Sequence, residues 1–232
     1  MSQICRFITC LLIFTALAEE ISARTCRIVF LNRPASAPKT LYLFDGEEIR
    51  EVELPRMNLS PVYKLPDGNL NLRFFLTPPT DLKKIPEDTP SVKMPEATKD
   101  LYLILTSNPE NKVAPINVQA VSADSTKLSR GEMLWFNLTE KRVGGKVGSE
   151  KLDIKPHIRE RVAEPRRGVG DYPVELYFTI KGDKHVHPLC ESRWRHDPRS
   201  RSLVFISNNG KRRAPRIFSF SDFRMPEKEK KE

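Results

Sequence analysis

Long apolar segments are scarce in this sequence of 232 residues, and only one near the start stands out. It runs from Phe7 to Leu17, 11 residues, whereas a helix that spans a bilayer needs about 20. No later stretch is apolar enough to cross a membrane. The sequence therefore predicts no integral membrane span once this first segment is removed.

Motifs that carry catalysis are also absent. There is no Gly-x-Ser-x-Gly, the turn that exposes a nucleophilic serine, and the only cysteines beyond the leader are Cys26 and Cys190. Gly144, Gly145 and Gly148 lack the Gly-Lys-Ser/Thr ending of a phosphate-binding loop, so we interpret them as a turn. We predict that the protein is not an enzyme and uses no cofactor.

Histidine is rare, with four residues in all. His185 and His187 would share one face of a strand, and Cys190 and His196 follow, which makes a metal site an alternative to consider. Pro188 interrupts that strand, and we interpret the histidines as exposed side chains near a turn. The prediction is that no metal is bound.

The leader has the three parts of a secretory signal. Arg6 is followed by the apolar run and then by Ala16-Leu17-Ala18, an Ala-x-Ala pattern that a signal peptidase can cut. Residues 1–18 are thus a predicted signal peptide, with a cut after Ala23 as the alternative. An uncleaved anchor or a buried N-terminal helix is the other interpretation. The predicted location is secreted or periplasmic, in the cell envelope.

The net charge of +9 is unevenly spread. Residues 100–232 carry 26 Lys and Arg against 18 Asp and Glu, while residues 19–99 carry 12 of each. A basic half favours envelope polymers or other envelope proteins as partners, and its alternative is a solvated basic surface. No helix-turn-helix, zinc-finger or RNP-like motif is visible, so we predict no nucleic acid as partner.

Cysteine usage depends on the leader. Cys5 and Cys10 leave with it, so the mature chain keeps Cys26 and Cys190. In an oxidising compartment these two could form a disulfide, whose loop of about 165 residues would stabilise the fold by roughly 5 kcal/mol. The alternative is two separate thiols that act as small apolar residues. The sequence leaves both open.

Short strands and frequent turns run through the rest of the chain. Leu70, Leu72 and Phe74 alternate with polar residues, as in a half-buried strand, and residues 174–180 repeat that pattern. With 19 prolines and no long amphipathic helix, the predicted class is all-β: one or two immunoglobulin-like β-sandwich domains joined by a Pro-rich segment, after an N-terminal signal helix.

The predicted organisation follows the prolines. Residues 24–76 form a first β domain or lobe, and residues 77–99 form a Pro-rich linker, because proline removes backbone donors and fixes φ. The alternative is that this stretch is an extended cover over a sheet edge. Residues 100–225 form a second β-sandwich domain. Residues 226–232 form a disordered charged tail.

Aromatic residues beside arginines supply a candidate ligand contact. Trp194 lies between Arg193 and Arg195, a segment that suits an anionic ligand or a glycan. The alternative is that Trp135 belongs to the core and Trp194 covers a sheet edge with its neighbours in solvent.

Three segments resemble uncharacterised exported bacterial all-β proteins: residues 134–156 (LWFNLTEKRVGGKVGSEKLDIKP), 26–34 (CRIVFLNRP) and 41–46 (LYLFDG). The resemblance implies export and β structure, and it carries no functional residues. We therefore expect an exported non-catalytic β-sandwich protein with a structural or protein-interaction role in the cell envelope. A glycan- or anionic-polymer-binding module is the second hypothesis, and an envelope hydrolase is the third.

Overall fold

The computed structural model describes residues 24–123, 128–209 and 212–223, so the predicted signal peptide and charged tail lie outside the described residues. Within these ranges all regular structure is β: sixteen strands form four sheets of four strands each. The all-β part of the predicted fold is confirmed. None of the described residues belongs to a helix with the length and apolar character that a membrane crossing requires.

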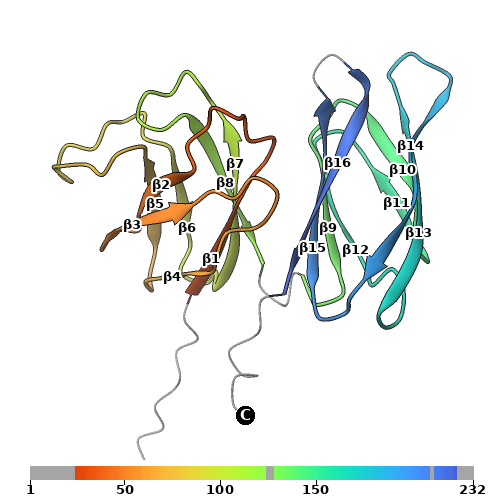
Figure 1. Cartoon of the computed structure of the whole chain (residues 1–232), viewed down its shortest axis with the longest axis horizontal. Helices are drawn as coiled ribbons and strands as arrows, with labels where there is room; N and C mark the ends of the chain where they lie inside the picture. Colours follow the sequence, from red (N-terminus) through yellow and green to blue (C-terminus); the bar gives the residue numbers. More distant parts are fainter. Residues whose placement is uncertain (1–23, 124–127, 210–211, 224–232) are drawn as a thin grey trace, which may run out of the picture.

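The first eight strands form one sandwich (Figure 1). Its first outer sheet has the order β3-β2-β5-β6, and its first inner sheet has the order β4-β1-β7-β8. The bounds are β1 (Arg24–Phe30), β2 (Thr40–Phe44), β3 (Ile49–Glu53), β4 (Tyr63–Leu65), β5 (Leu70–Phe75), β6 (Ser91–Met94), β7 (Asp100–Ser107) and β8 (Ile116–Ser122).

The second eight strands form a second sandwich beside the first. Its second inner sheet has the order β12-β9-β15-β16, and its second outer sheet has the order β11-β10-β13-β14. The bounds are β9 (Met133–Asn137), β10 (Arg142–Val147), β11 (Glu150–Ile154), β12 (Arg159–Val162), β13 (Gly170–Thr179), β14 (Val186–His196), β15 (Arg201–Asn209) and β16 (Arg212–Asp222).

The two sandwiches share one topology. Adding eight to each strand number of the first pair of sheets gives the strand order of the second pair. Both sandwiches also contain one parallel pairing between their first and seventh strands, β1 with β7 and β9 with β15. The described residues therefore form two copies of one eight-stranded arrangement.

This order differs from the immunoglobulin arrangement. There the first two strands, A and B, share one sheet, and the third strand lies in the other. Here the first strand of each sandwich lies in an inner sheet, while the second and third form a hairpin in an outer sheet. The predicted sandwich architecture is present, with a different path of the chain through it.

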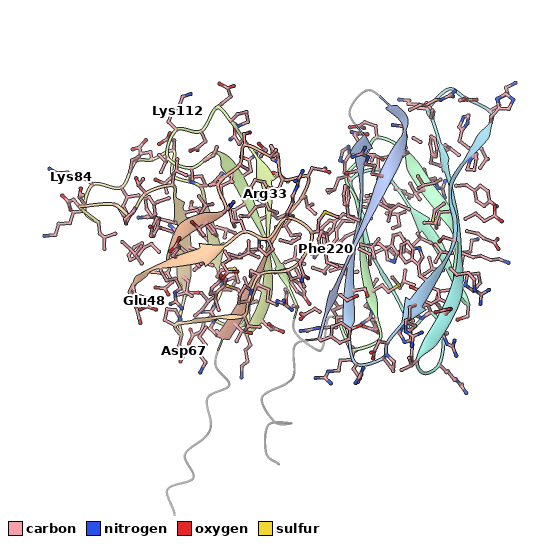
Figure 2. The ribbon with its side chains drawn as sticks, in the orientation of Figure 1. Arg33, Glu48, Asp67, Lys84, Lys112 and Phe220 are labelled. Atoms are coloured by element: carbon pink, nitrogen blue, oxygen red, sulfur yellow. The ribbon has the colours of Figure 1, made fainter. Side chains whose placement is uncertain are left out.

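The four sheets stack as outer, inner, inner, outer, with an apolar layer in each of the three gaps. The middle layer joins the two sandwiches, and Figure 2 shows Phe220 of β16 there, while Glu48 and Lys84 lie at the far side of the first sandwich. Its buried members are Val29, Leu31, Leu59, Tyr102, Ile104, Val121, Ala123, Leu128, Leu134, Phe136, Leu203, Phe205 and Phe220.

Strands in the inner sheets bury both faces, which explains their sequences. In β1, Ile28 and Phe30 point into the first sandwich, whereas Val29 points to the middle layer. In β15, Val204 and Ile206 point into the second sandwich, while Leu203 and Phe205 face the middle layer. A strand buried on both faces has a nearly continuous apolar run instead of an alternating pattern. The inner strands therefore have continuous apolar runs because one sandwich packs on the other through the middle layer.

The border between the two sandwiches lies between β8 and β9, because strands pair only within β1–β8 or within β9–β16. The boundary predicted at residues 77–99 lies elsewhere, within the first sandwich. β6 lies inside that predicted linker and pairs with β5 through Leu70 and Met94. β7, at the start of the predicted second domain, pairs in parallel with β1 through Cys26 and Leu101. A parallel partner is reached only by a long crossover, so the first inner sheet needs strands from far along the chain. The prolines belong to connections within the first sandwich.

The glycines predicted to form a turn lie mainly in a strand. Gly144 and Gly145 are in β10, and Gly148 closes the hairpin to β11 with φ 61°. Gly145 has φ 146°, and a Cβ there would lie 1.9 Å from the carbonyl oxygen of Glu175 on β13. Glycine at 145 therefore allows the backbones of β10 and β13 to approach each other closely.

Candidate functional site

The predicted ligand-contact residues lie on β14, an edge strand of the second outer sheet. Arg193 and Arg195 are exposed, and Arg195 Nη1 lies 3.8 Å from a carboxylate oxygen of Asp171. Trp194 points the other way, into the second sandwich, because successive side chains of a strand alternate between faces. The structure therefore separates the tryptophan ring from the two arginines on either side of it.

Trp194 stacks on Trp135 of β9. The ring centroids are 5.8 Å apart and the planes differ by 4°. Trp135 is fully buried, and its Nε1 has no hydrogen-bond partner among the described residues. Trp194 thus closes the edge of the second core above Trp135, as in the alternative that placed it over a sheet edge. The face of the Trp194 ring that meets Trp135 is therefore not available to a sugar.

The two mature cysteines lie in different sandwiches. Cys26 is buried in the first core, and Cys190 is half-buried on β14. Both are thiols in the structure, which corrects the disulfide alternative for Cys26 and Cys190. Two inner sheets separate the core that holds Cys26 from the sheet that holds Cys190, whereas a disulfide needs Cα atoms within about 7 Å. Burial raises the pKa of the Cys190 thiol.

His185, just before β14, and His187, within it, contact the same carboxylate, whereas His196 Nε2 lies 2.9 Å from Glu164 Oε1. Asp183 Oδ1 lies 2.9 Å from His185 Nδ1, and its Oδ2 lies 2.9 Å from His187 Nε2. Arg213 donates to the same Oδ2. Hydrogen bonds from the His185 backbone and from both imidazoles hold the pKa of Asp183 well below its usual range. Over residues 24–123, 128–209 and 212–223 no group of three His, Cys, Asp or Glu side chains is placed to hold a metal.

Buried charge joins the two sandwiches at one end of the middle layer. Asp222 of β16 accepts a hydrogen bond from Arg27 at 2.8 Å and one from the Tyr102 hydroxyl at 2.5 Å. Arg201 lies 3.4 Å from Asp222 and 2.9 Å from Asp100. We call Arg27, Tyr102, Arg201 and Asp222 the Asp222 network. Its members come from β1, β7, β15 and β16, so it links both inner sheets.

The surroundings of Tyr102 keep it neutral. Burial raises the pKa of its hydroxyl far above the usual value, Arg201 and Arg27 oppose that rise, and Asp222 adds to it. The Arg201 guanidinium also lies 5.9 Å from the centroid of the Tyr102 ring. The neutral tyrosine hydroxyl donates a hydrogen bond to the buried carboxylate of Asp222, which a buried acceptor needs.

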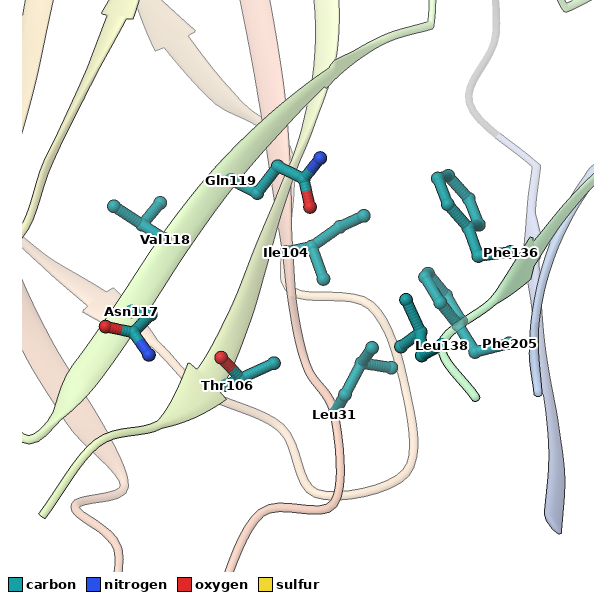
Figure 3. Close-up of a pocket in the computed structure, with 9 residues that line it drawn as sticks. All are labelled: Leu31, Ile104, Thr106, Asn117, Val118, Gln119, Phe136, Leu138 and Phe205. Carbon is teal, nitrogen blue, oxygen red and sulfur yellow. The ribbon is translucent and has the colours of Figure 1, made fainter. Parts of the chain in front are cut away.

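The opposite end of the middle layer holds a partly open cavity of about 140 Å³, the junction cavity (Figure 3). Leu31 and Ile104 of the first sandwich and Phe136, Leu138 and Phe205 of the second supply its apolar surface. Thr106, Asn117, Val118 and Gln119 complete the lining. Asn32 Nδ2 donates to Ser207 Oγ at 3.2 Å and joins the sandwiches at this end. The cavity is thus held open between two fixed surfaces.

A polar turn positions Leu138 at this cavity. Asn137 is buried, and its Nδ2 donates to the carbonyl oxygens of Lys141 at 2.6 Å and Lys155 at 3.1 Å. Its Oδ1 accepts from the Thr139 hydroxyl at 2.8 Å. These bonds fix the chain on both sides of Leu138, whose side chain remains partly exposed at the cavity. The Asn-Leu-Thr sequence is therefore a turn in which the side-chain amide of Asn137 hydrogen-bonds to the surrounding backbone.

Sequence reasoning placed the candidate site on β14 and did not find the junction cavity. The available signal was the apolar run MLWFNL at residues 133–138, because a strand that buries both faces needs a second packing partner. What the run could not indicate was which other strands meet it. Comparison with protein-family models and with curated proteins finds no match, so the resemblance to exported bacterial proteins stays a proposal.

Proposed function

We propose that this chain is an exported, non-catalytic β-sandwich protein with a protein-interaction role in the cell envelope, and that contact is made at the junction cavity. The observation that carries the proposal is an apolar cavity, open to solvent, between two sandwiches that the middle layer and the Asp222 network hold together. Of its apolar lining, Leu138 is exposed and Val118 is half-buried, whereas the other apolar side chains are buried. An accessible apolar side chain in a rigid concave site is typical of a binding surface.

Rigidity supports this role. The middle layer buries apolar side chains from both inner sheets, and each fully buried Leu, Val or Phe contributes roughly 1.5–3 kcal/mol. Breaking a buried ion pair by removing one partner costs about 3–5 kcal/mol. The shape of the junction cavity is therefore fixed before a partner binds, which lowers the entropic cost of binding.

Export is supported by the leader and its Ala-x-Ala pattern. The test is to express the full chain in a bacterial host and measure the intact mass of the protein released from the periplasm. Loss of residues 1–18 or 1–23 is the expected result. A full-length protein confined to the cytoplasm would contradict export.

Contact at the junction cavity is tested by site-specific photo-crosslinking in intact envelopes. A photoreactive residue replaces Gln119, which lines the cavity, and a matched one replaces Glu51, exposed on edge strand β3 of the first outer sheet. The proposal expects a discrete adduct from position 119 that disappears when Leu138→Glu puts a charge at the cavity mouth. Equal adducts from both positions, or an adduct that survives Leu138→Glu, would refute it.

A second candidate function, binding of an anionic polymer, is favoured by Arg193 and Arg195 projecting together from the outer face of β14. Their effect is tempered by Asp171 and Glu191 on the same face. Salt-sensitive retention on heparin, lost in Arg193→Ala with Arg195→Ala, would support this candidate. Absence of retention at low salt would dismiss it.

A further inference from the structure

We infer that the occupant of the junction cavity is an extended peptide segment that adds a strand to β8, places one apolar side chain in the cavity, and presents acidic side chains to Arg159 and Arg161. This inference rests on the proposed function, because it names the kind of partner that the same site takes. The inference is supported by the edge of β8, by the direction of its backbone groups, by the size of the junction cavity, and by the arginines of the second sandwich that face this edge.

The edge of β8 offers backbone groups for pairing. β8 is the edge strand of the first inner sheet. It pairs on one side with β7, through Leu103↔Ala120 and Leu105↔Val118, and its other side has no strand beside it in this sheet. Beyond the two ends of this ladder, Ala123 N donates to Asp100 O, and Asn108 N donates to Pro115 O. In an antiparallel pair, directly hydrogen-bonded pairs alternate with non-bonded ones.

That alternation fixes which backbone groups face outward. Asp100 and Ala123 form one bonded pair, and Asn108 and Pro115 form another. Counting every second pair between them makes Ile104↔Gln119 a bonded pair of the β7–β8 ladder. Val118 and Ala120 are then in non-bonded pairs, so their N–H and C=O groups point away from β7. An incoming chain can hydrogen-bond to these groups as the next strand of the sheet.

The cavity lies on the face where such a strand would project side chains. Asn117 and Gln119 of β8 line it together with Phe136 and Leu138 of the second sandwich. An added strand would lie about 4.8 Å beyond β8, with every second side chain directed to the second inner sheet. A cavity of about 140 Å³ is close to the ~150 Å³ that holds a benzene ring in an apolar site, so one aromatic or leucine-sized side chain fits.

Charge complementarity decides the chemistry of the neighbouring positions. β12 is the edge strand of the second inner sheet next to β9, with Arg159 opposite Phe136 and Arg161 opposite Leu134. Phe136 and Leu134 face the middle layer, and residues directly opposite each other share a face, so both exposed arginines point to the first-sandwich side. Arg161 also lies 3.6 Å from Glu132, a contact that an acidic partner would share or replace. β12 lies one strand beyond β9, as the added strand would lie one strand beyond β8. Acidic residues two positions from the apolar anchor therefore meet these arginines.

The test uses a defined probe, the labelled peptide Thr-Glu-Val-Phe-Val-Glu-Thr with both ends blocked, titrated by fluorescence anisotropy with the mature protein. Its sequence reads the same from either end, so the peptide can place the same side chains whether it lies parallel or antiparallel to β8. Saturable binding is expected, and it should weaken with Lys in place of Glu and with Ala in place of Phe. Binding that ignores both replacements, or no saturable binding, would overturn the inference.

Backbone pairing is tested from both sides. Val118→Pro removes an outward N–H and leaves the β7–β8 bonds intact, so affinity should fall about tenfold. Glu51→Pro is the matched control, because the bonds Leu54 N to Lys39 O and Asp45 N to Glu48 O place Glu51 in a non-bonded pair on edge strand β3. This control should bind the peptide as the unchanged protein does.

N-methylated peptides keep the test independent of whether Val118→Pro folds. A strand that pairs along one edge uses the N–H groups of every second residue, and reversing its direction exchanges the two sets, so a peptide methylated on either alternate set should keep part of the affinity while one methylated on every residue should not bind. Full affinity of the peptide methylated on every residue would refute strand addition. Charge reversal with Arg159→Glu and Arg161→Glu should turn the preference to the Lys peptide, and an unchanged preference would remove the acidic requirement.

The outcomes separate this inference from the function beneath it. If no peptide binds while Gln119 still gives a Leu138-dependent adduct in envelopes, protein contact stands and strand addition falls. If the mature protein instead forms a dimer that Val118→Pro abolishes, the occupant is a second copy of this chain, and the peptide inference is overturned. Sedimentation velocity of the unchanged and Val118→Pro proteins distinguishes these results.

Discussion

The hydroxyl of Tyr102 on β7 donates a 2.5 Å hydrogen bond to Asp222 on β16, 120 residues away, and joins the two sandwiches through a buried contact. Arg27 and Arg201 supply the balancing positive charge. The last strand of the second sandwich thereby depends on the first and seventh strands of the first. The two halves are expected to unfold together, since removing either one exposes charge and an apolar layer at once.

Asp222→Ala should be strongly destabilising. It would remove the carboxylate that Arg27 contacts and leave Arg201 with Asp100, and removing one partner of a buried ion pair costs about 3–5 kcal/mol. Urea unfolding monitored by tryptophan fluorescence measures the loss. Asp171→Ala, at an exposed contact with Arg195, is the control and should leave the midpoint unchanged. A small effect at Asp222 would mean that the network contributes little.

Alkaline pH should weaken the fold through buried tyrosines. Burial raises the pKa of Tyr172 to about 12 and that of Tyr102 further, whereas tyrosine in an unfolded chain ionises near pH 10. Because the folded pKa values are raised, their contribution is fully present below about pH 10 and is lost as the pH rises toward the folded values. Each such group adds a slope of up to about 1.4 kcal/mol per pH unit in that window.

Tyr172→Phe isolates this effect. Its hydroxyl contacts the Met133 sulfur at 3.7 Å, a weak acceptor, so the substitution should cost little at neutral pH and should flatten the fall of stability above about pH 10. Tyr102→Phe should flatten it too, but with a loss at neutral pH of about 1–3 kcal/mol, because Asp222 loses a donor. Urea midpoints at several pH values would test this. Identical slopes in all three proteins would contradict it.

Trp194→Ala should open the second core over Trp135. Removing the stacked ring exposes the indole of Trp135 to water, which should shift its fluorescence to longer wavelength and cost about 3 kcal/mol of stability. Arg193→Ala and Arg195→Ala, whose side chains are on the opposite face, serve as controls and should leave the emission unchanged. An unshifted emission in Trp194→Ala would show that Trp135 is protected by other groups.

The two cysteines should be thiols with different reactivity. Mass spectrometry of the mature protein without reductant should show no loss of two hydrogens. Cys190 is half-buried with a raised pKa, so a thiol reagent should modify it slowly, and Cys26, fully buried, should react only after unfolding. A disulfide between the two would overturn the arrangement of the sandwiches.

Gly145→Ala should disrupt the second outer sheet. Its φ is 146°, and the added carbon would meet the Glu175 carbonyl oxygen at 1.9 Å, so β10 and β13 must separate. Gly144→Ala is a matched control in the same strand, because the nearest atom to its Cβ is at 3.4 Å. We expect a large loss of thermal stability only in Gly145→Ala. Similar melting temperatures for both variants would show that the strand yields there.

The sequence by itself determined the β class, because alternation such as Leu70, Leu72 and Phe74 has the period of a strand, and most short strands follow it. The continuous apolar runs of the inner strands are typical of burial on both faces, but the sequence did not indicate what would cover the second face. Only the tertiary structure decided that β7 completes the sheet of β1, that Trp194 turns inward onto Trp135, and that Cys26 and Cys190 lie in different sandwiches. The physical reason is that period and composition fix a strand's local conformation and its exposed face, whereas pairing partners are chosen by long-range packing and hydrogen bonds between segments that no local pattern connects.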